Sequence, residues 1–234
     1  MALLLIASVG ASAQSLTQLP GSTLPVLSHS MVSGTPSPSE TVYCTVSLKP
    51  RFPNELQAFV NSASDPRSDS YRHWLTPAQV GQQFGASPMV VSGVVNYLKS
   101  NGLTITLQAP NNMAITARGT VAQIQNAFGT VIKTYSGPDP LGRTESFRAN
   151  STILRFPWSL AKYVQCVTGI DNWAKPHAWA TQTLTPPLTR GLYNTKPAYL
   201  LGFRGEGRTV GITNFDGFQL SNVPLYCSAF NLPV

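Results

Sequence analysis

The clearest regular pattern in the chain is an alternation of apolar and polar residues from Thr41 to Leu48. Every second residue there is apolar and would lie on one side of an extended backbone. A period of two predicts a strand with one buried face. Shorter runs of β-branched and apolar residues predict further strands. These lie at 103–107, 113–117, 131–135 and 164–170.

Apolar residues spaced three and four apart predict helices between these strands. They lie at 54–60, 76–85, 87–102 and 120–129. Thr76 and Thr120 are each followed by Gln three residues later, which is a capping box at a helix start. Asn54 can cap the first helix, and Gly85 can end the second in the left-handed conformation. This order of elements predicts an α+β fold, an antiparallel sheet with helices on one face.

Composition narrows the classes of function. The 234 residues are 42% hydrophobic, which is enough for a packed core, and only 11% charged, with a formal net charge of +7. Lys and Arg are scattered singly along the chain, so we expect no nucleic-acid partner. The four tryptophans would suit a carbohydrate-binding protein, but packing in a core or an interface is the simpler use for them.

The N-terminus has the composition of an export signal. Residues 1–13 are apolar and end in Ala11-Ser12-Ala13, a small-residue cleavage pattern, so we expect a signal peptide and a secreted protein. The apolar run is too short to span a bilayer, and we expect no membrane attachment after its removal. Residues 14–39 are rich in Ser, Thr, Pro and Gly, which predicts a flexible segment. A glycosylation sequon begins at Asn150.

One motif joins a polar turn to a group of aromatic residues, which we expect to be buried, and then to a helix start. Its positions are Asp65, Pro66, Ser68, Tyr71, Trp74, Leu75, Thr76, Pro77, Phe84 and Gly85. A second motif further along consists of Ala127, Phe128, Gly129 and Thr130. Both resemble the activation domain of the sedolisin (pro-kumamolisin type) serine-carboxyl peptidases. Relatives often have His after the motif's Tyr, where this chain has Arg72.

The resemblance implies a division of the chain into regions. Residues 40–173 resemble the peptidase activation domain, a ferredoxin-like propeptide, and Phe147-Arg148-Ala149 resembles one strand of that domain. Residues 174–187 would form a processing linker, and 188–234 resemble the start of a truncated subtilisin-like α/β catalytic domain. In that last region we expect helices at 188–194 and 221–230 and a buried strand at 208–214.

The residues that carry catalysis in this family are not found in the sequence. The family uses a Ser nucleophile and a Glu four residues before an Asp, but no Glu-x-x-x-Asp occurs here. Asp65 and Asp69 share that spacing, yet they lie in a polar turn, which predicts a loop-stabilising role. His29, His73 and His177 show no context for a Ser-His-Asp triad. We expect no peptidase activity and no cofactor or metal site. The calcium that relatives bind belongs to a region of the catalytic domain absent from this sequence.

The resemblance also implies a function and a partner. An activation domain of this family assists the folding of its own catalytic domain and then inhibits it. Proteolysis removes the activation domain, and we expect acidification to trigger this step. The open face of the sheet would dock on the catalytic domain of the same polypeptide. The alternative is a stand-alone secreted inhibitor or binding module that has lost the catalytic domain.

Three cysteines occur in the sequence. The first and last strands are neighbours in a ferredoxin-like sheet, so Cys44 and Cys166 can form a disulfide, which leaves Cys227 without a partner in this chain. Two buried free thiols at the first two positions agree with the sequence equally well.

Overall fold

The structure is a computed structural model that describes residues 15–140, 142–174, 185–207 and 219–232. The chain divides into two compact units, Met1–Ala174 and Lys175–Val234. We describe each unit by itself. The predicted signal peptide and most of the predicted linker lie outside the described residues.

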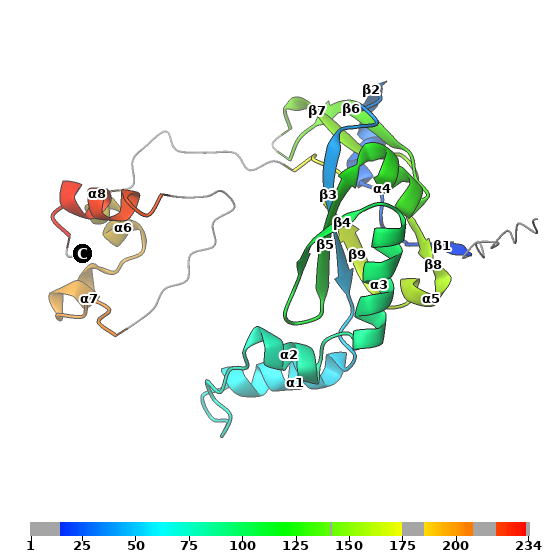
Figure 1. Ribbon diagram of the computed structural model, residues 1–234. Helices are drawn as coiled ribbons and strands as arrows, with labels where there is room; N and C mark the ends of the chain where they lie inside the picture. Colours follow the sequence, from blue (N-terminus) through cyan, green and yellow to red (C-terminus); the bar gives the residue numbers. More distant parts are fainter. Residues whose placement is uncertain (1–14, 141, 175–184, 208–218, 233–234) are drawn as a thin grey trace, which may run out of the picture. The chain divides into compact units, whose positions relative to one another are not determined.

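The first unit is built on a four-stranded antiparallel sheet with the strand order β4-β5-β3-β9. Two helices, α3 and α4, pack on one face of this sheet (Figure 1). The elements are β3 (Thr41–Leu48), α3 (Pro88–Ser100), β4 (Thr104–Gln108), β5 (Ala114–Thr120), α4 (Val121–Phe128) and β9 (Val164–Thr168). Their order along the chain and across the sheet is that of a ferredoxin-like fold, so the predicted α+β architecture is confirmed.

The alternation that predicted the first strand also positions the core. Val42, Val46 and Leu48 point toward the helices and are buried, while the residues between them lie on the opposite face. From the other side, α3 contributes Val94 and Leu98, which are fully buried. Burial of such side chains contributes roughly 1.5–3 kcal/mol each and is the main stabilising term of the domain.

Local capping rules set the starts of three helices. Thr76 begins α2 (Pro77–Gln83) and Thr120 begins α4, each in a complete capping box, as predicted. Ser87 caps α3, where its hydroxyl oxygen accepts a hydrogen bond from the amide of Val90. Gly129 ends α4 in the left-handed conformation with φ of 52°. Each of these capping interactions joins residues at most four positions apart, so the sequence pattern alone predicts it.

Two predicted helix ends are wrong. Helix α1 (Pro53–Ser64) has Phe52 at its N-cap position and no side-chain cap, so Asn54 lies inside the helix. Gly85 does not have a positive φ, because α2 ends at Phe84 instead. Gly85 is needed for a close approach of two backbones: a Cβ there would overlap the carbonyl oxygen of Asn111, in the turn between β4 and β5.

The N-terminal segment predicted to be flexible is ordered from residue 15, which corrects that prediction. Strand β1 (Leu16–Gln18) pairs with β8 (Arg155–Pro157), and β2 (Met31–Gly34) pairs with β6 (Ile132–Pro138). A short 3-10 helix, η1 (Pro25–His29), lies between them. Backbone pairing with strands 100 or more residues away fixes this segment despite its polar composition.

A second, three-stranded sheet has the order β2-β6-β7, with β7 at Thr144–Asn150. Asn150 at its end is buried, and its side-chain amide donates to the carbonyl oxygens of Ser22 and Thr152. The glycosylation sequon therefore begins at a structural residue, whose amide is inaccessible in the folded chain. A short helix, α5 (Trp158–Ala161), follows β8.

The second unit contributes three helices to the described residues: α6 (Pro186–Leu192), α7 (Lys196–Leu200) and α8 (Asn222–Ala229). Helices α6 and α8 lie where the sequence predicted helices. The strand predicted at 208–214 lies outside the described residues. In the described part of the chain, no helix has both the length and the apolar character needed to cross a membrane.

Candidate functional site

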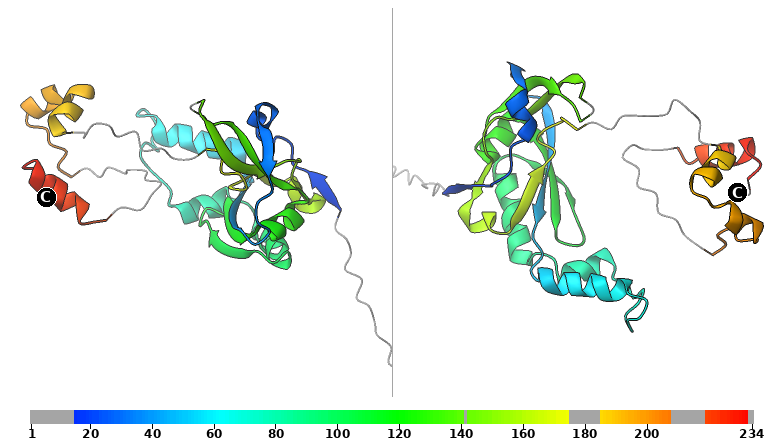
Figure 2. Two further views of the ribbon diagram at one scale, coloured as in Figure 1. Left: turned by 90° about the horizontal axis from the view of Figure 1, so that it is seen from above. Right: turned by 180° about the vertical axis from the view of Figure 1, so that it is seen from behind.

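Helices α3 and α4 cover one face of the four-stranded sheet and leave the other face uncovered. Residues on this open face are exposed or half-buried. They are Thr104 and Leu107 of β4, Tyr43, Thr45 and Ser47 of β3, Ala114, Thr116 and Arg118 of β5, and Cys166 and Thr168 of β9. Seen from behind, the strands face the viewer (Figure 2, right). The threonines and Ser47 make the middle of this face polar and low in relief, while Tyr43 and Leu107 add two exposed large side chains.

Strand register holds the open face in a fixed arrangement. Thr45 lies opposite Thr116 on one neighbouring strand and opposite Thr168 on the other. The hydroxyl groups of Thr45 and Thr116 are hydrogen-bonded at 2.9 Å, and the Thr106 hydroxyl donates to the Thr116 carbonyl oxygen at 3.3 Å. A row of threonines across the sheet gives low relief, which suits contact with a helix or another flat surface.

The first family motif lies in the loop between α1 and α2 and in α2 itself, at one end of the sheet (Figure 1). Asp65, at the end of α1, accepts hydrogen bonds from the backbone and the guanidinium of Arg67, and this arginine lowers the pKa of the Asp65 carboxyl. These contacts of Asp65 hold the turn in place, which agrees with a loop-stabilising role. Pro66 lies in the same turn, and Phe84 at the end of α2 is buried.

The aromatic residues of the motif are not buried as expected. Tyr71 and Leu75 are half-buried, and Trp74 is 62% exposed. The backbone explains this difference: Arg72 has a φ of 63°, in the left-handed region, and reverses the chain direction just before Trp74. The sequence pattern shows which residues lie together, but not that this turn directs the tryptophan outward.

The second family motif lies in the core, away from the open face. Ala127 and Phe128 are fully buried at the end of α4, and Phe128 stacks on Phe156 of β8 with ring centroids 5.9 Å apart. Phe156 in turn makes an edge-on contact with Tyr97, whose hydroxyl donates to the Ala127 carbonyl oxygen at 2.6 Å. This motif therefore has a packing role.

Arg148 and Trp173 fix the place where the first unit ends, directly before the predicted linker. The guanidinium of Arg148 pairs with the Glu40 carboxylate at 2.9 Å. The backbone amide of Arg148 donates to the side-chain oxygen of Asn172 at 2.7 Å. The indole of Trp173 donates to the Pro138 carbonyl oxygen at 2.7 Å. Sequence reasoning placed Arg148 in a family strand but missed this anchor, because its partners lie far apart along the chain.

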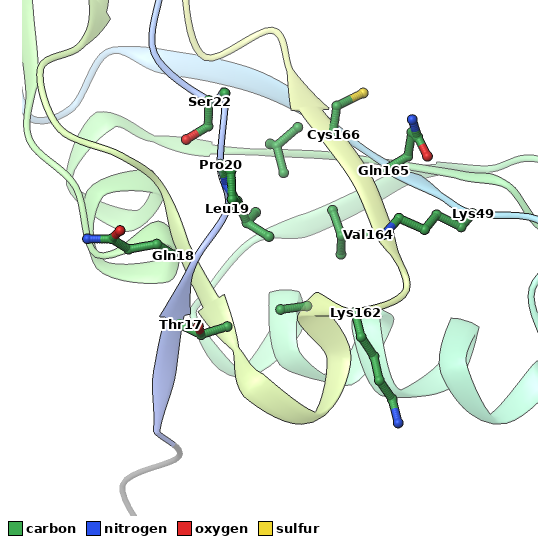
Figure 3. Close-up of a pocket in the computed structure, with 13 residues that line it drawn as sticks. Thr17, Gln18, Leu19, Pro20, Ser22, Lys49, Lys162, Val164, Gln165 and Cys166 are labelled. Atoms are coloured by element: carbon green, nitrogen blue, oxygen red, sulfur yellow. The ribbon is translucent and has the colours of Figure 1, made fainter.

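One pocket, of about 490 Å³, lies beside the outer edge of β9 (Figure 3). Residues 17–22 form its other wall, and Leu19 and Val164 are buried there. Lys49 and Lys162 line it, and Cys166 lies at its upper end in the close-up. Its lining contains no histidine or carboxylate that could act as a general base, so the pocket has no catalytic constellation.

The structure brings none of the other candidate catalytic residues together. His29 and His73 are exposed on separate elements, and His177 lies outside the described residues. Asp65 and Asp69 remain in the α1–α2 loop. Within the described ranges, no group of three or more His, Cys, Asp and Glu residues could hold a metal ion.

The cysteine arrangement contradicts the possible disulfide. Strands β3 and β9 are neighbours as expected, but Cys166 lies opposite Ser47 rather than Cys44. Because side chains alternate between faces, Cys44 points into the core and Cys166 lies on the open face. Both thiols are free, and Cys227 of α8 is free as well.

Comparisons with known proteins agree with this fold. A family model described as "Pro-kumamolisin, activation domain" matches residues 28–173. Because the match covers more than half of the chain, the protein belongs to this family and contains an activation domain of the sedolisin type of peptidase. The match includes the end of η1 and all of β2, which the sequence had assigned to a flexible segment.

Two curated peptidases are similar to the same part of the chain. Xanthomonalisin from Xanthomonas sp. (strain T-22) is 35% identical over 136 residues, which is 58% of this chain and 16% of that protein. Sedolisin from Pseudomonas sp. (strain 101) is 28% identical over 138 residues, which is 59% of this chain and 23% of that protein. The chain therefore aligns with less than a quarter of the length of either relative.

Proposed function

We propose that the first unit is the propeptide of a secreted sedolisin-type endopeptidase, and that it assists folding of the catalytic domain and inhibits it until proteolysis removes it. The single observation that carries this proposal is the open face of the sheet, which is flat and uncovered in a domain that belongs to the activation-domain family. The apolar sequence of residues 1–13 supports export.

Docking of this face fits its chemistry. Small hydroxyl side chains such as those of Thr45, Thr116 and Thr168 lose little side-chain entropy when covered, and they offer hydrogen bonds to a partner. The anchor at Arg148 and Trp173 fixes where the chain leaves the sheet, so the residues that follow start from a defined point. A stand-alone inhibitor would use the same face; the two possibilities differ in whether one polypeptide carries both domains.

A substitution at the centre of the open face tests the docking. The full chain is added to the separately produced catalytic domain of Xanthomonalisin, and the inhibition constant is measured for the wild type and Thr116→Arg. A long charged side chain at the centre of a flat contact will weaken inhibition at least about tenfold. Asn96→Arg, which adds the same charge on the exposed side of α3, is the matched control and will leave inhibition unchanged. A wild-type chain that does not inhibit at all contradicts the proposed function.

Acidification is the proposed signal for release. Residues 40–171 contain eleven Lys or Arg against seven Asp or Glu, so this region is basic. Carboxylates of a partner that pair with these cations have a lower pKa in the complex than when free. Their contribution to binding is therefore present above the free pKa of about 4 and is lost as the pH falls through the lower, bound value.

The affinity of the chain for the catalytic domain, measured from pH 7 to pH 3, will decrease below about pH 4. The decrease will be smaller at high salt. Equal affinity across this range would rule out charge pairing as the release mechanism.

A further inference from the structure

Residues 52–85 form a protrusion at one end of the sheet, made of α1, the loop after it and α2 (Figure 1). This protrusion exposes large apolar side chains: Trp74 is 62% exposed, Phe52 47% and Val60 42%. In α1, Ala63 is the single buried residue. A helix with so few buried residues gains little stability from packing against its own domain.

The protrusion is nevertheless firmly attached to the sheet. The Arg51 guanidinium donates to the carbonyl oxygens of Gly85 and Gln82, and the Arg51 amide donates to the Phe84 carbonyl oxygen. Phe84 contacts Phe59 of α1 with ring centroids 5.9 Å apart. Because Gly85 has no Cβ, α2 also approaches the β4–β5 turn closely. The exposed residues are therefore carried on a segment that hydrogen bonds and close backbone contacts join to the end of the sheet.

The loop that carries Trp74 is built to hold it outward. Arg72 keeps its left-handed backbone while its amide donates to the Ala63 carbonyl oxygen at 2.9 Å. The Trp74 amide donates to the Arg72 carbonyl oxygen at 3.0 Å, which tightens the turn. Ser62 and Ser68 share a hydrogen bond of 2.7 Å at the base of the loop. Unfavourable backbone geometry that directs a large aromatic side chain into solvent is typical of binding sites.

The protrusion continues the open face. In both views of Figure 2, α1 lies at the end of the sheet on the side away from α3 and α4, which cover the opposite face. A partner that lies flat on the open face would therefore meet the protrusion at one end of the contact. Tryptophan is enriched among the residues that dominate binding energy in protein interfaces.

We propose that the protrusion is a second docking element for the catalytic domain, and that Trp74 is its anchor. This inference rests on the proposed function. It adds a second region of the propeptide, outside the sheet, that contacts the catalytic domain. The indole would insert into an apolar depression on the catalytic domain, and the rigid loop would limit the entropy lost on binding. The catalytic domain is the occupant we commit to because the surface is continuous with the proposed docking face.

The experiment compares two exposed tryptophans in the same inhibition assay with the Xanthomonalisin catalytic domain. Trp74→Ala will raise the inhibition constant at least about tenfold. Trp158→Ala is the matched control, because Trp158 is 60% exposed but lies on α5, away from the protrusion. It will change the constant less than about twofold. Both variants will keep the wild-type melting temperature, since neither side chain is part of the core.

The outcomes separate this inference from the proposed function. If Trp74→Ala inhibits like the wild type while Thr116→Arg fails to inhibit, the docking face stands and the anchor is overturned. If Trp74→Ala is impaired while Thr116→Arg is unaffected, the protrusion stands and docking through the sheet is overturned. Equal losses for Trp74→Ala and Trp158→Ala would also overturn the anchor, because exposure alone would then explain the effect.

Discussion

Replacing Phe128 with alanine is expected to lower the free energy of unfolding of the first unit by about 3–5 kcal/mol. The ring is fully buried and stacks on Phe156, which links the end of α4 to β8. Its removal leaves a cavity between α4 and the strands below, and the rigid sheet on one side limits how far the site can collapse. Stacking between the rings adds to the loss.

Urea denaturation, followed by far-ultraviolet circular dichroism, measures this effect. Phe52→Ala is the control, because it removes the same ring from a position that is 47% exposed, and it should cost less than about 1 kcal/mol. A Phe128→Ala loss as small as that of the control would mean that the ring does not support the core. The second family motif would then need a role other than packing.

The features that could be predicted from the sequence are those set by near neighbours. The strand at Thr41–Leu48 was predicted at its observed limits because its alternation extends over eight residues. The capping boxes at Thr76 and Thr120 were predicted because each needs only a residue three positions later. In the same way, Gly129 ends α4 through its own φ angle.

The features that were missed depend on partners far away in the chain. The Ser22 hydroxyl accepts a hydrogen bond from the Leu154 amide, 132 residues later, and such contacts order a segment whose composition alone predicts flexibility. Gly85 is required by the nearby Asn111 carbonyl, which no local rule reveals. Neither alternative for Cys44 and Cys166 was fully right, for the same reason: both thiols are free, but Cys166 is exposed, and the register that places it on the open face was not known.

The candidate site was partly accessible to sequence reasoning. The open face follows from the alternation in β3, since the same pattern that buries Val46 exposes its neighbours on the other face. The exposure of Trp74 did not follow, because aromatic clusters are usually packed and the left-handed Arg72 is visible only in the structure. The proposed docking role of the protrusion rests on this departure from the expected burial.

The thiol of Cys44 has an environment that makes it nearly inert. Its side chain points into the core between the sheet and the helices, with 1% of its surface exposed. Burial raises the pKa of the Cys44 thiol from its ordinary value of 9.0 to about 12, despite a hydrogen bond with the backbone of Ala117 that acts in the opposite direction. Because the thiolate is the reactive form, its population near pH 8 falls roughly a thousandfold.

Labelling of the folded protein with a maleimide at pH 8 is therefore expected to modify Cys166 rapidly, and Cys44 at least about a thousandfold more slowly. Cys166→Ala will remove the fast reaction in the first unit, whereas Cys44→Ala will leave the native labelling unchanged. In guanidinium without reductant, all three thiols of the wild type should react, because Cys44 and Cys166 lie on opposite faces and are both free. Only one reactive thiol under those conditions would contradict the arrangement of β3 and β9, since the two cysteines would have to meet on the same face of the sheet.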